Sequence, residues 1–363
     1  GLIICSLVIY QQVQFIQTSD VGYQKEFVIA QSIDSEVVNA YSALESLKES
    51  LPQIEEMTMV YETPTSIDWR DGLMNNEGEQ MLITANPVEK DYVKPFGIKL
   101  VAGNDFSRQD QLQAYSDSAS VLNQQGRNIL INEKAAQEMG WTAEEAIGQK
   151  IQFKGNSTII GVTDNFYFGP VHEEVGPLFL FIDVMYNQVV FRMSGNNLAN
   201  SLSLIEREWE KIAPHIPFEP QFLDEEFNAM YENEQKLGML FAFFTVLAVI
   251  LGSLGLLGLS ALMISHRTRE IGIRKILGAS VKQIVSALSV DFMKLVLIAF
   301  LISIPVAWYF MDQWLQTFAH RISMPWYIFI FSGLILLVLA LITLSTQTVR
   351  AAVRNPADVI RSE

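Results

Sequence analysis

One short run in the sequence has the residue types of a metal site. The run HEEVG, which begins at His172, starts like the zinc-protease motif H-E-x-x-H. In that motif two histidines bind zinc and the glutamate acts as the general base. Gly176 stands where the second histidine is required, so we interpret the run as a solvated loop of charges. His215, His266 and His320 are scattered along the chain. The sequence therefore predicts no metal site.

Other groups that could do chemistry are explained without catalysis. The carboxylate pairs Glu144/Glu145 and Glu225/Glu226 are typical of helix starts or surface charges. The phosphate-binding pattern G-x-x-x-x-G-K-[ST] does not occur in the sequence, so we expect no ATP hydrolysis by that route. We predict that the chain is not an enzyme and holds no cofactor.

A basic segment, SHRTREIGIRKILGASVKQIV from Ser265 to Val285, lies between two very apolar segments. Helical spacing places four apolar residues on one stripe, at i, i+4, i+8 and i+11: Ile273, Leu277, Val281 and Ile284. The basic residues fall on the other faces: Arg267, Arg274, Lys275 and Lys282. Glu270 can pair with Arg274 at i, i+4. The pattern predicts one amphipathic helix next to a membrane.

Two roles fit such a helix. It could lie in the membrane interface and hold its basic charges against anionic lipid. Alternatively, it could be a docking helix for a cytoplasmic partner. The pattern alone leaves both interpretations open.

Long apolar segments indicate a membrane protein. Leu237 to Ile264 and Ile322 to Val349 are each 28 residues without Asp, Glu, Lys, Arg or His, and Leu295 to Met311 adds 17. A hydrocarbon core of about 30 Å needs about 20 such residues as helix. The first ten residues, GLIICSLVIY, are too short to span alone. We interpret them as the outer end of a helix that starts outside this sequence, in a longer protein.

The charges predict the orientation of the chain in the membrane. Asp20 to Lys236 carries 35 acidic and 15 basic residues, whereas the remainder carries 5 acidic and 10 basic ones. Because basic loops stay in the cytoplasm, we place the Ser265 to Val285 segment and the C-terminal tail inside and Asp20 to Lys236 outside.

The outer region alternates short apolar runs with helical patterns and predicts an α+β domain in two lobes. Its expected joints are Gly103 to Gly126 and Asn165 to Pro177. The segment from Asp224 to Lys236 has no Pro or Gly, so we expect one continuous helix that enters the Leu237 span. The run after Tyr10 predicts a matching helix, and the two would form a stalk.

The basic segment resembles a known family. RTREIGIRKILGAS, from Arg267, is similar to the signature of the FtsX-like permease family, and the closing RAAVRNPADVIRSE resembles the end of that family's domain. Three upstream runs resemble the MacB-type periplasmic core domain: ILINEKAAQEMGW, IGQKI and IIGVTDNFYFGPVHEEVGPLFLF. The resemblance covers nearly the whole chain and is closest to the C-terminal unit of permeases with two such units.

The resemblance implies a permease of a mechanotransmission-type ABC transporter in a bacterial inner membrane. The expected fold is a helical bundle, with the end of one transmembrane helix and three full ones, and an inserted extracytoplasmic α+β domain on a helical stalk. The expected parts are the end of helix 1 with its stalk (1–19), the α+β domain (20–223), the stalk with helix 2 (224–264), a coupling helix (265–287), and helices 3 and 4 with the tail (288–363).

The resemblance also implies partners. A cytoplasmic ABC ATPase on a separate chain is expected to dock on the coupling helix, whose contact residues would be Arg267, Arg269, Glu270, Ile273, Arg274, Lys275, Leu277, Gly278 and Val281. A second permease unit, the lipid bilayer and a periplasmic adaptor or client are further expected partners, and nucleic acid is not. One alternative is an FtsX-like regulator of a cell-wall hydrolase that transports nothing. Another is a receptor or anchor without an ATPase.

Overall fold

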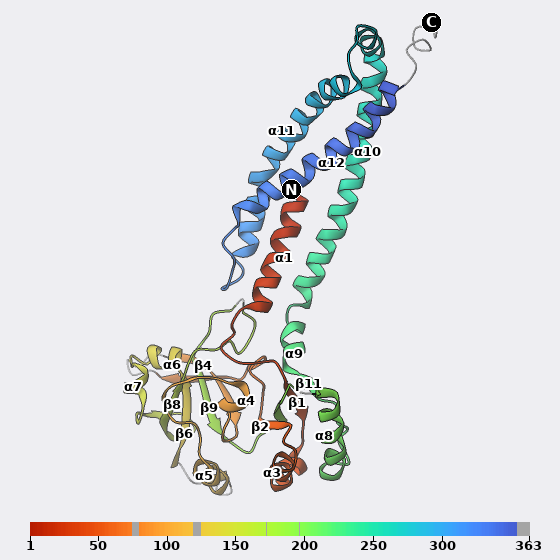
Figure 1. Ribbon diagram of the computed structural model, residues 1–363. Coiled ribbons are helices and arrows are strands. Elements are labelled where there is room, and N and C mark those ends of the chain that lie inside the picture. The colour runs from red at the N-terminus through yellow and green to blue at the C-terminus, as the bar shows by residue number, and fades with distance from the viewer. Residues whose placement is uncertain (75–79, 119–124, 172, 196, 354–363) are drawn as a thin grey trace. The chain divides into compact units, whose positions relative to one another are not determined.

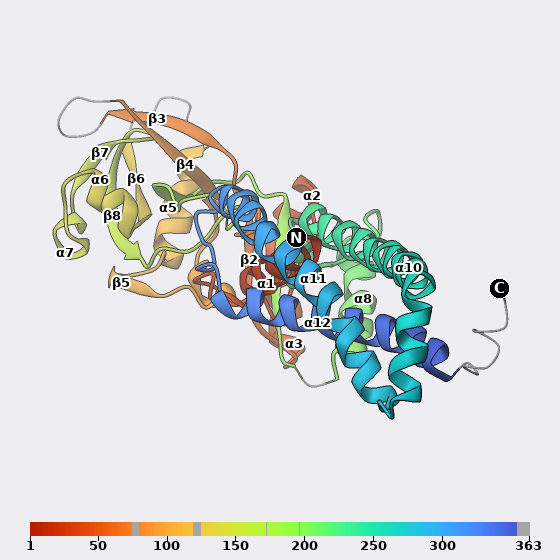
Figure 2. The ribbon, with the colours of Figure 1, turned by 90° about the horizontal axis from the view of Figure 1, so that it is seen from above.

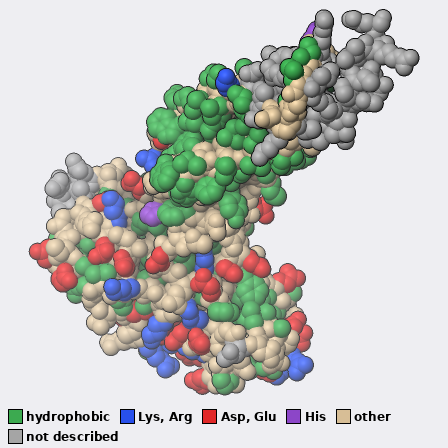
Figure 3. All heavy atoms as spheres, turned by 45° about the horizontal axis from the view of Figure 1, so that its top comes forward, with side chains coloured by type: hydrophobic (Ala, Val, Ile, Leu, Met, Phe, Trp, Pro, Cys, Tyr) green, Lys and Arg blue, Asp and Glu red, His purple; other side chains and the backbone are tan. Residues whose placement is uncertain are grey.

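The computed structural model describes residues 1–363 except 75–79, 119–124, 172, 196 and 354–363. His172 and the end of the closing motif therefore lie outside the described residues. The chain divides into two compact units: Gly1–Thr18 with Glu232–Glu363, and Ser19–Tyr231. We call them the helical unit and the α+β domain. Hydrophobic side chains cover the visible helices of the first, whereas charged side chains are spread over the visible face of the second (Figure 3).

The helical unit consists, in its described part, of four helices (Figure 1). They are α1 (Leu2–Thr18), α10 (Glu232–Ile276), α11 (Val281–Leu315) and α12 (Trp326–Val353). Three stretches are long and apolar enough to cross a membrane: Glu232–Met263, Phe292–Leu315 and Trp326–Thr346. Each overlaps an apolar segment that the sequence predicted to be a span.

Helix α10 differs from the expectation at both ends. The predicted continuous helix from Asp224 is wrong, because α9 (Leu223–Ala229) ends before α10 begins and belongs to the α+β domain. At its other end α10 runs past Ile264 to Ile276 without a break. Its 45 residues span about 68 Å, so the helix extends well beyond a hydrocarbon core of about 30 Å.

The polar half of α1 holds a loop in place. Gln12 is fully buried, and its Nε2 donates to the carbonyl of His320 at 2.9 Å while its Oε1 accepts from the amide of Ile322 at 2.9 Å. The Phe15 ring stacks on His320 with 5.9 Å between ring centroids. One buried side chain thus satisfies both a donor and an acceptor in the loop between α11 and α12. The run that we expected to form a stalk with α10 also fixes this loop.

The α+β domain is built on one twisted, mixed sheet. Its strand order is β11-β1-β10-β2-β4-β9-β6-β8-β5, with β3 on β4 and β7 on β8. The strands are β1 (Val28–Ser32), β2 (Ile54–Val60), β3 (Arg70–Met74), β4 (Gln80–Val88), β5 (Leu100–Gly103), β6 (Gln125–Asn132), β7 (Lys150–Gln152), β8 (Asn156–Thr163), β9 (Leu178–Ile182), β10 (Gln188–Met193) and β11 (Gln221–Phe222). In Figure 2, β3 and β4 run side by side as a ribbon.

Seven shorter helices accompany this sheet besides α9, in the part of the domain that the structure describes. They are α2 (Ser35–Asn39), α3 (Tyr41–Ser50), α4 (Val93–Phe96), α5 (Arg108–Ser118), α6 (Glu133–Glu138), α7 (Ala143–Ala146) and α8 (Leu198–Ile212). Helices α3 and α8 contribute Leu44, Leu47, Ile205 and Trp209 to one hydrophobic core, together with β1, β2 and β10. Helices α6 and α7 cover a second core over β6, β8 and β9.

The joints between the two cores differ from the expected ones. Gly103 to Gly126 and Asn165 to Pro177 connect elements on the side of the second core. The chain crosses between the cores after β2, at residues 61–69, and after β9, at residues 183–187. Helix α5 lies within the first of these two expected joints, and the turn residues did not indicate which segments pass from one core to the other.

We predict that Gln12→Leu destabilises the helical unit. The substitution leaves the carbonyl of His320 and the amide of Ile322 without their partner, and each buried polar group left unpaired costs about 1 to 3 kcal/mol. The midpoint of thermal unfolding of the purified protein in detergent should fall by several degrees. Gln14→Leu is the matched control, because Gln14 is exposed on the same helix. Equal midpoints for the two variants would contradict the role of Gln12.

Candidate functional sites

A tight turn joins α10 to α11 and contains part of the predicted docking segment. The amide of Leu277 donates to the carbonyl of Ile273 at 3.0 Å and completes the last turn of α10. Gly278 follows with a φ of +92°, a conformation that a residue with a Cβ rarely adopts. Ser280 then caps α11: its Oγ accepts from the amide of Gln283 at 3.3 Å, and the Gln283 Oε1 accepts from the amide of Ser280 at 2.9 Å. This reciprocal pair is a capping box.

The predicted coupling segment is therefore not one helix. The stripe expected on Ile273, Leu277, Val281 and Ile284 is wrong as a single face, because the chain reverses at Gly278 and the last two residues belong to α11. Ile273 and Leu277 remain on the α10 side, with 52% and 80% of their surfaces exposed. Two large apolar side chains next to a rigid turn form a surface that can contact a partner.

The remaining predicted contact residues are placed only by their backbone. Arg267, Arg269, Glu270, Arg274 and Lys275 lie in the last turns of α10, and Val281 is the first residue of α11. Their side chains, and with them the expected Glu270–Arg274 pair, lie outside the described part of the structure. Arg274 and Lys275 belong to the last turn of α10, where basic residues are favoured by the helix dipole.

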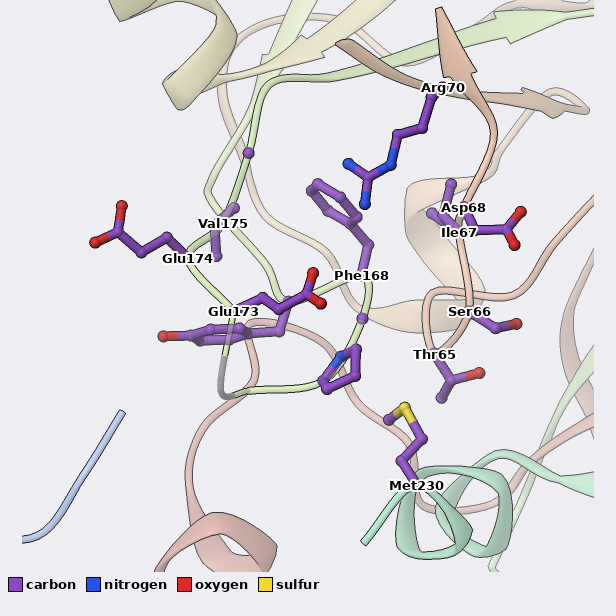
Figure 4. Close-up of a pocket in the computed structure, with 14 residues that line it drawn as sticks. Thr65, Ser66, Ile67, Asp68, Arg70, Phe168, Glu173, Glu174, Val175 and Met230 are labelled. Atoms are coloured by element: carbon purple, nitrogen blue, oxygen red, sulfur yellow. The ribbon is translucent and has the colours of Figure 1, made fainter. Parts of the chain in front are cut away.

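A second candidate site is a cavity of about 320 Å³ in the α+β domain (Figure 4). Residues 65–68, between β2 and β3, and Arg70 at the start of β3 form one wall. Residues 167–170 and 173–176, before β9, form the other. The walls are joined where the amide of Ile67 donates to the carbonyl of Phe168 at 3.1 Å. Met230, just after α9, closes one side with its thioether.

Charged groups from both walls extend into this cavity. Arg70 and Glu173 point into the space beside the Phe168 ring, whereas Asp68 and Glu174 point away from it (Figure 4). One N–H of the Arg70 guanidinium donates to Thr84 Oγ1 at 2.8 Å, which fixes its position. The cavity thus offers a guanidinium, a carboxylate and an aromatic ring to a polar molecule or to a side chain of another protein.

Both walls of the cavity are attached to α9 and to the residue that precedes α10. The Glu226 carboxylate accepts from Thr63 Oγ1 at 3.2 Å and from Ser66 Oγ at 3.3 Å, which ties the first wall to α9. The amide of Val171 in the second wall donates to the Tyr231 hydroxyl at 2.6 Å. Tyr231 is 1% exposed and lies directly before Glu232, the first residue of α10.

Sequence reasoning missed these attachments. It treated Glu226 as a helix-start charge, which is half correct, since Asp224, Glu225 and Glu226 do lie in the first turn of α9. Its partners Thr63 and Ser66 are 163 and 160 residues away in sequence. Nothing in the local pattern marks such a contact. No cluster of three or more His, Cys, Asp or Glu residues that could hold a metal ion occurs among the described residues.

Two family models match the chain. The model of the MacB-like periplasmic core domain matches residues 6–200, which is more than half of the 363 residues, and the model of the FtsX-like permease C-terminal domain matches residues 242–356. The chain belongs to the family of FtsX-like, MacB-type permeases of ABC transporters. It is therefore a multi-pass membrane protein with a periplasmic-type domain, as the resemblance of its motifs predicted.

Individual proteins with a name or a solved structure are also similar to this chain, at 12 to 22% identity. The chain is 22% identical over 323 residues to the probable syringafactin export ATP-binding/permease protein SyfD of Pseudomonas syringae pv. tomato, covering 80% of this chain and 46% of SyfD. It thus spans about half the length of that relative. Among solved structures it is similar to the periplasmic region of MacB from Actinobacillus actinomycetemcomitans (12% identity, TM-score 0.38, 60% of this chain and 94% of that one). It is also similar to the extracellular domain of the noncanonic ABC-type transporter YknZ from Gram-positive bacteria (13% identity, TM-score 0.35, 53% of this chain and 97% of that one).

We predict that Tyr231→Phe loosens the second wall of the cavity. The substitution removes the acceptor of the Val171 amide, a buried donor whose loss of a partner costs about 1 to 3 kcal/mol. Hydrogen exchange of the segment from Phe168 to Val171 should accelerate roughly tenfold, since about 1.4 kcal/mol corresponds to a factor of ten. Tyr10→Phe, which removes a hydroxyl from a tyrosine that is 64% exposed on α1, should leave the exchange unchanged. Unchanged exchange in Tyr231→Phe would mean that the hydroxyl does not hold the wall.

Proposed function

We propose that this chain is the permease subunit of a mechanotransmission-type ABC transporter in a bacterial inner membrane. ATP hydrolysis takes place on a separate cytoplasmic ATPase chain. The motion of the membrane helices passes to the α+β domain, which acts on a client outside the membrane. The client itself need not cross the bilayer through this chain.

The observation that carries this proposal is the combination of two domains in one chain. A MacB-like periplasmic core domain at 6–200 and an FtsX-like permease domain at 242–356 occur together, while the phosphate-binding loop pattern does not occur in the sequence. The relative SyfD is described as an export ATP-binding/permease protein, so ATP binding and permease are named together in one protein; this supports export and coupling of the permease to an ATP-binding unit. We extend export to this chain as part of the proposal.

The turn between α10 and α11 is the proposed docking site for the ATPase. The exposed apolar side chains of Ile273 and Leu277 would enter a groove on the ATPase, and the basic residues of the last turns of α10 would pair with its acidic rim. Because Gly278 and the Ser280 capping box fix the turn, displacement of the turn would move both helices together. The excess of basic residues at this end supports a cytoplasmic location.

A second permease unit is the proposed partner within the membrane. Gly252, Gly255 and Gly258 follow one another along α10, and no described atom lies within 4 Å of the position that a Cβ would occupy at any of them. Glycines on a helix surface allow another helix to approach closely in a membrane. This open face of α10 supports pairing with a homologous unit.

The proposed output passes through α9. Glu226 and the hydroxyl of Tyr231 attach the two walls of the cavity to the residues directly before α10. A displacement of α10 would thus reach the segments 63–66 and 167–171 through these hydrogen bonds. The cavity between those segments is the proposed contact for a periplasmic adaptor or client.

Leu277→Asp should weaken association with the ATPase. The variant places a charge where an apolar side chain would be buried, and burial of a leucine contributes about 1.5 to 3 kcal/mol, so binding should fall roughly tenfold or more. Co-purification of the ATPase with the membrane-inserted permease measures it. Leu112→Asp is the control, because Leu112 is 61% exposed on α5 of the α+β domain. If the ATPase stays fully bound to Leu277→Asp, the turn is a lipid contact and the docking role is abandoned.

Glu226→Ala tests the transfer of motion and leaves the docking turn intact. We expect ATP hydrolysis by the assembled transporter to continue while export output falls severalfold, because α9 loses its hydrogen bonds to Thr63 and Ser66. The neighbouring exposed carboxylate gives the matched control, Glu225→Ala. Both rates are measured in the same membranes. Output at the wild-type level in Glu226→Ala would show that the hydrogen bonds of Glu226 do not transmit the displacement.

A further inference from the structure

The sheet of the α+β domain is narrowest where its two halves meet. Strands β2 and β4 pair at Val60 and Val88, whereas the neighbouring pairs β10–β2 and β4–β9 extend over five or more residues. Beyond this bridge the Asn86 side chain bonds the backbone of Glu62, with Nδ2 to the carbonyl at 2.8 Å and Oδ1 from the amide at 3.2 Å. The first core lies on one side of this joint and the second core on the other. Few backbone hydrogen bonds therefore hold the halves together.

Glu89 is the residue after β4 and lies directly beside this bridge. Its backbone amide donates to the carbonyl of Met59 on β2 at 2.9 Å. Its carboxylate Oε2 accepts from the amide of Met59 at 3.0 Å, and its Oε1 accepts from Gln111 Nε2 on α5 at 3.2 Å. Met59 belongs to the first core, and α5 precedes β6 in the second half. The carboxylate thus connects the two halves beside the narrowest part of the sheet.

This carboxylate is 1% exposed and has no cation of its own among the described residues. The groups that face it are Tyr41 on α3, the adjoining Lys90 and Gln111 on α5. Glu45 lies near Tyr41 and Lys90, and Arg108 acts on Glu45. Lys90 Nζ pairs with Glu45 Oε1 at 2.8 Å rather than with Glu89. Burial raises the pKa of Glu89 to about 7, although hydrogen bonds from Tyr41 and from the amide of Met59 favour the ionised form.

We propose that Glu89 is a proton-operated latch between the two halves of the α+β domain. When the carboxyl group is protonated, the halves stay closed around it without burying a charge. When it ionises, the closed arrangement must hold a buried negative charge that has hydrogen-bond donors but no ion pair among the described residues. A state that lets water reach the group then becomes more favourable.

The pH dependence of the closed state follows from the raised pKa of Glu89. The pKa of Glu89 in the closed state lies above its ordinary value, so the closed state binds the proton more tightly than an open, solvated state does. The stabilisation of the closed state is fully present below the ordinary pKa of about 4.3 and is lost as the pH rises through about 7. The latch therefore responds in the near-neutral range.

Distance measurements between spin labels on the two halves test the latch in the full-length protein in lipid nanodiscs. Cysteines replace the exposed residues Glu49 on α3 and Glu144 on α7 in a Cys5→Ala background. We expect a narrow distance distribution at about pH 5 and a broader one at about pH 8.5, with a midpoint near pH 7. Glu89→Gln keeps the shape of the side chain without a charge and should give the narrow distribution at both pH values.

A control and a second measurement complete the test. Glu206→Gln, at an exposed carboxylate on α8, should retain the pH dependence of the parent. In the protein without substitutions at Glu89, hydrogen exchange at the Met59 amide, corrected for the intrinsic pH effect, should lose protection through pH 7. This measurement decides the matter if Glu89→Gln does not fold. A pH-independent distribution with constant protection, or a pH response that persists in Glu89→Gln, overturns the proposal.

Discussion

The helical unit depends on one constraint: in hydrocarbon, each backbone N–H and C=O must find its partner within its own helix. The chain therefore places its breaks at the ends of the apolar stretches. Leu277 to Ser280 separate α10 from α11, and the loop before Trp326 separates α11 from α12. At the first break the Ser280 capping box gives partners to the amides of Ser280 and Gln283, and at the second Gln12 gives partners to the carbonyl of His320 and the amide of Ile322. Long unbroken helices with firmly held ends are the result.

Unbroken helices determine where motion can enter and leave the protein. In the proposed mechanism the ATPase acts at the Gly278 turn, and α10 carries the displacement over its 45 residues. At the other end α9 is a separate short helix, so the link to the α+β domain runs through side chains rather than through a continuous helix. Hydrogen bonds of Glu226 and Tyr231 are directional, and they deliver the displacement to two particular segments.

Local patterns in the sequence predicted the features that local physics determines. The length of the apolar segments indicated the spans, and short apolar runs indicated that the outer region contains strands. The run LFLFI of β9 shows no alternation because it is buried on both faces, so its pattern does not identify a strand face. The coupling stripe failed because an i, i+4 pattern continues across Gly278, although the Gly and the Ser280/Gln283 box were readable stop and start signals. Glu89 and Glu226 depend on partners far away in sequence, which no window of residues can show.

The two proposals about the α+β domain meet in one segment of the chain. Residues 61–69 cross from the first core to the second, directly after Val60 of the narrow bridge. Thr63 and Ser66 in this segment are the groups that Glu226 holds, and Glu89 lies on the opposite side of the same bridge. A pull through α9 would thus act on the joint that Glu89 closes. If both proposals hold, protonation of Glu89 determines how much of a displacement of α10 the domain transmits. A domain with a closed joint moves as one body, whereas in a domain with an open joint the two halves move relative to each other and less of the displacement is transmitted.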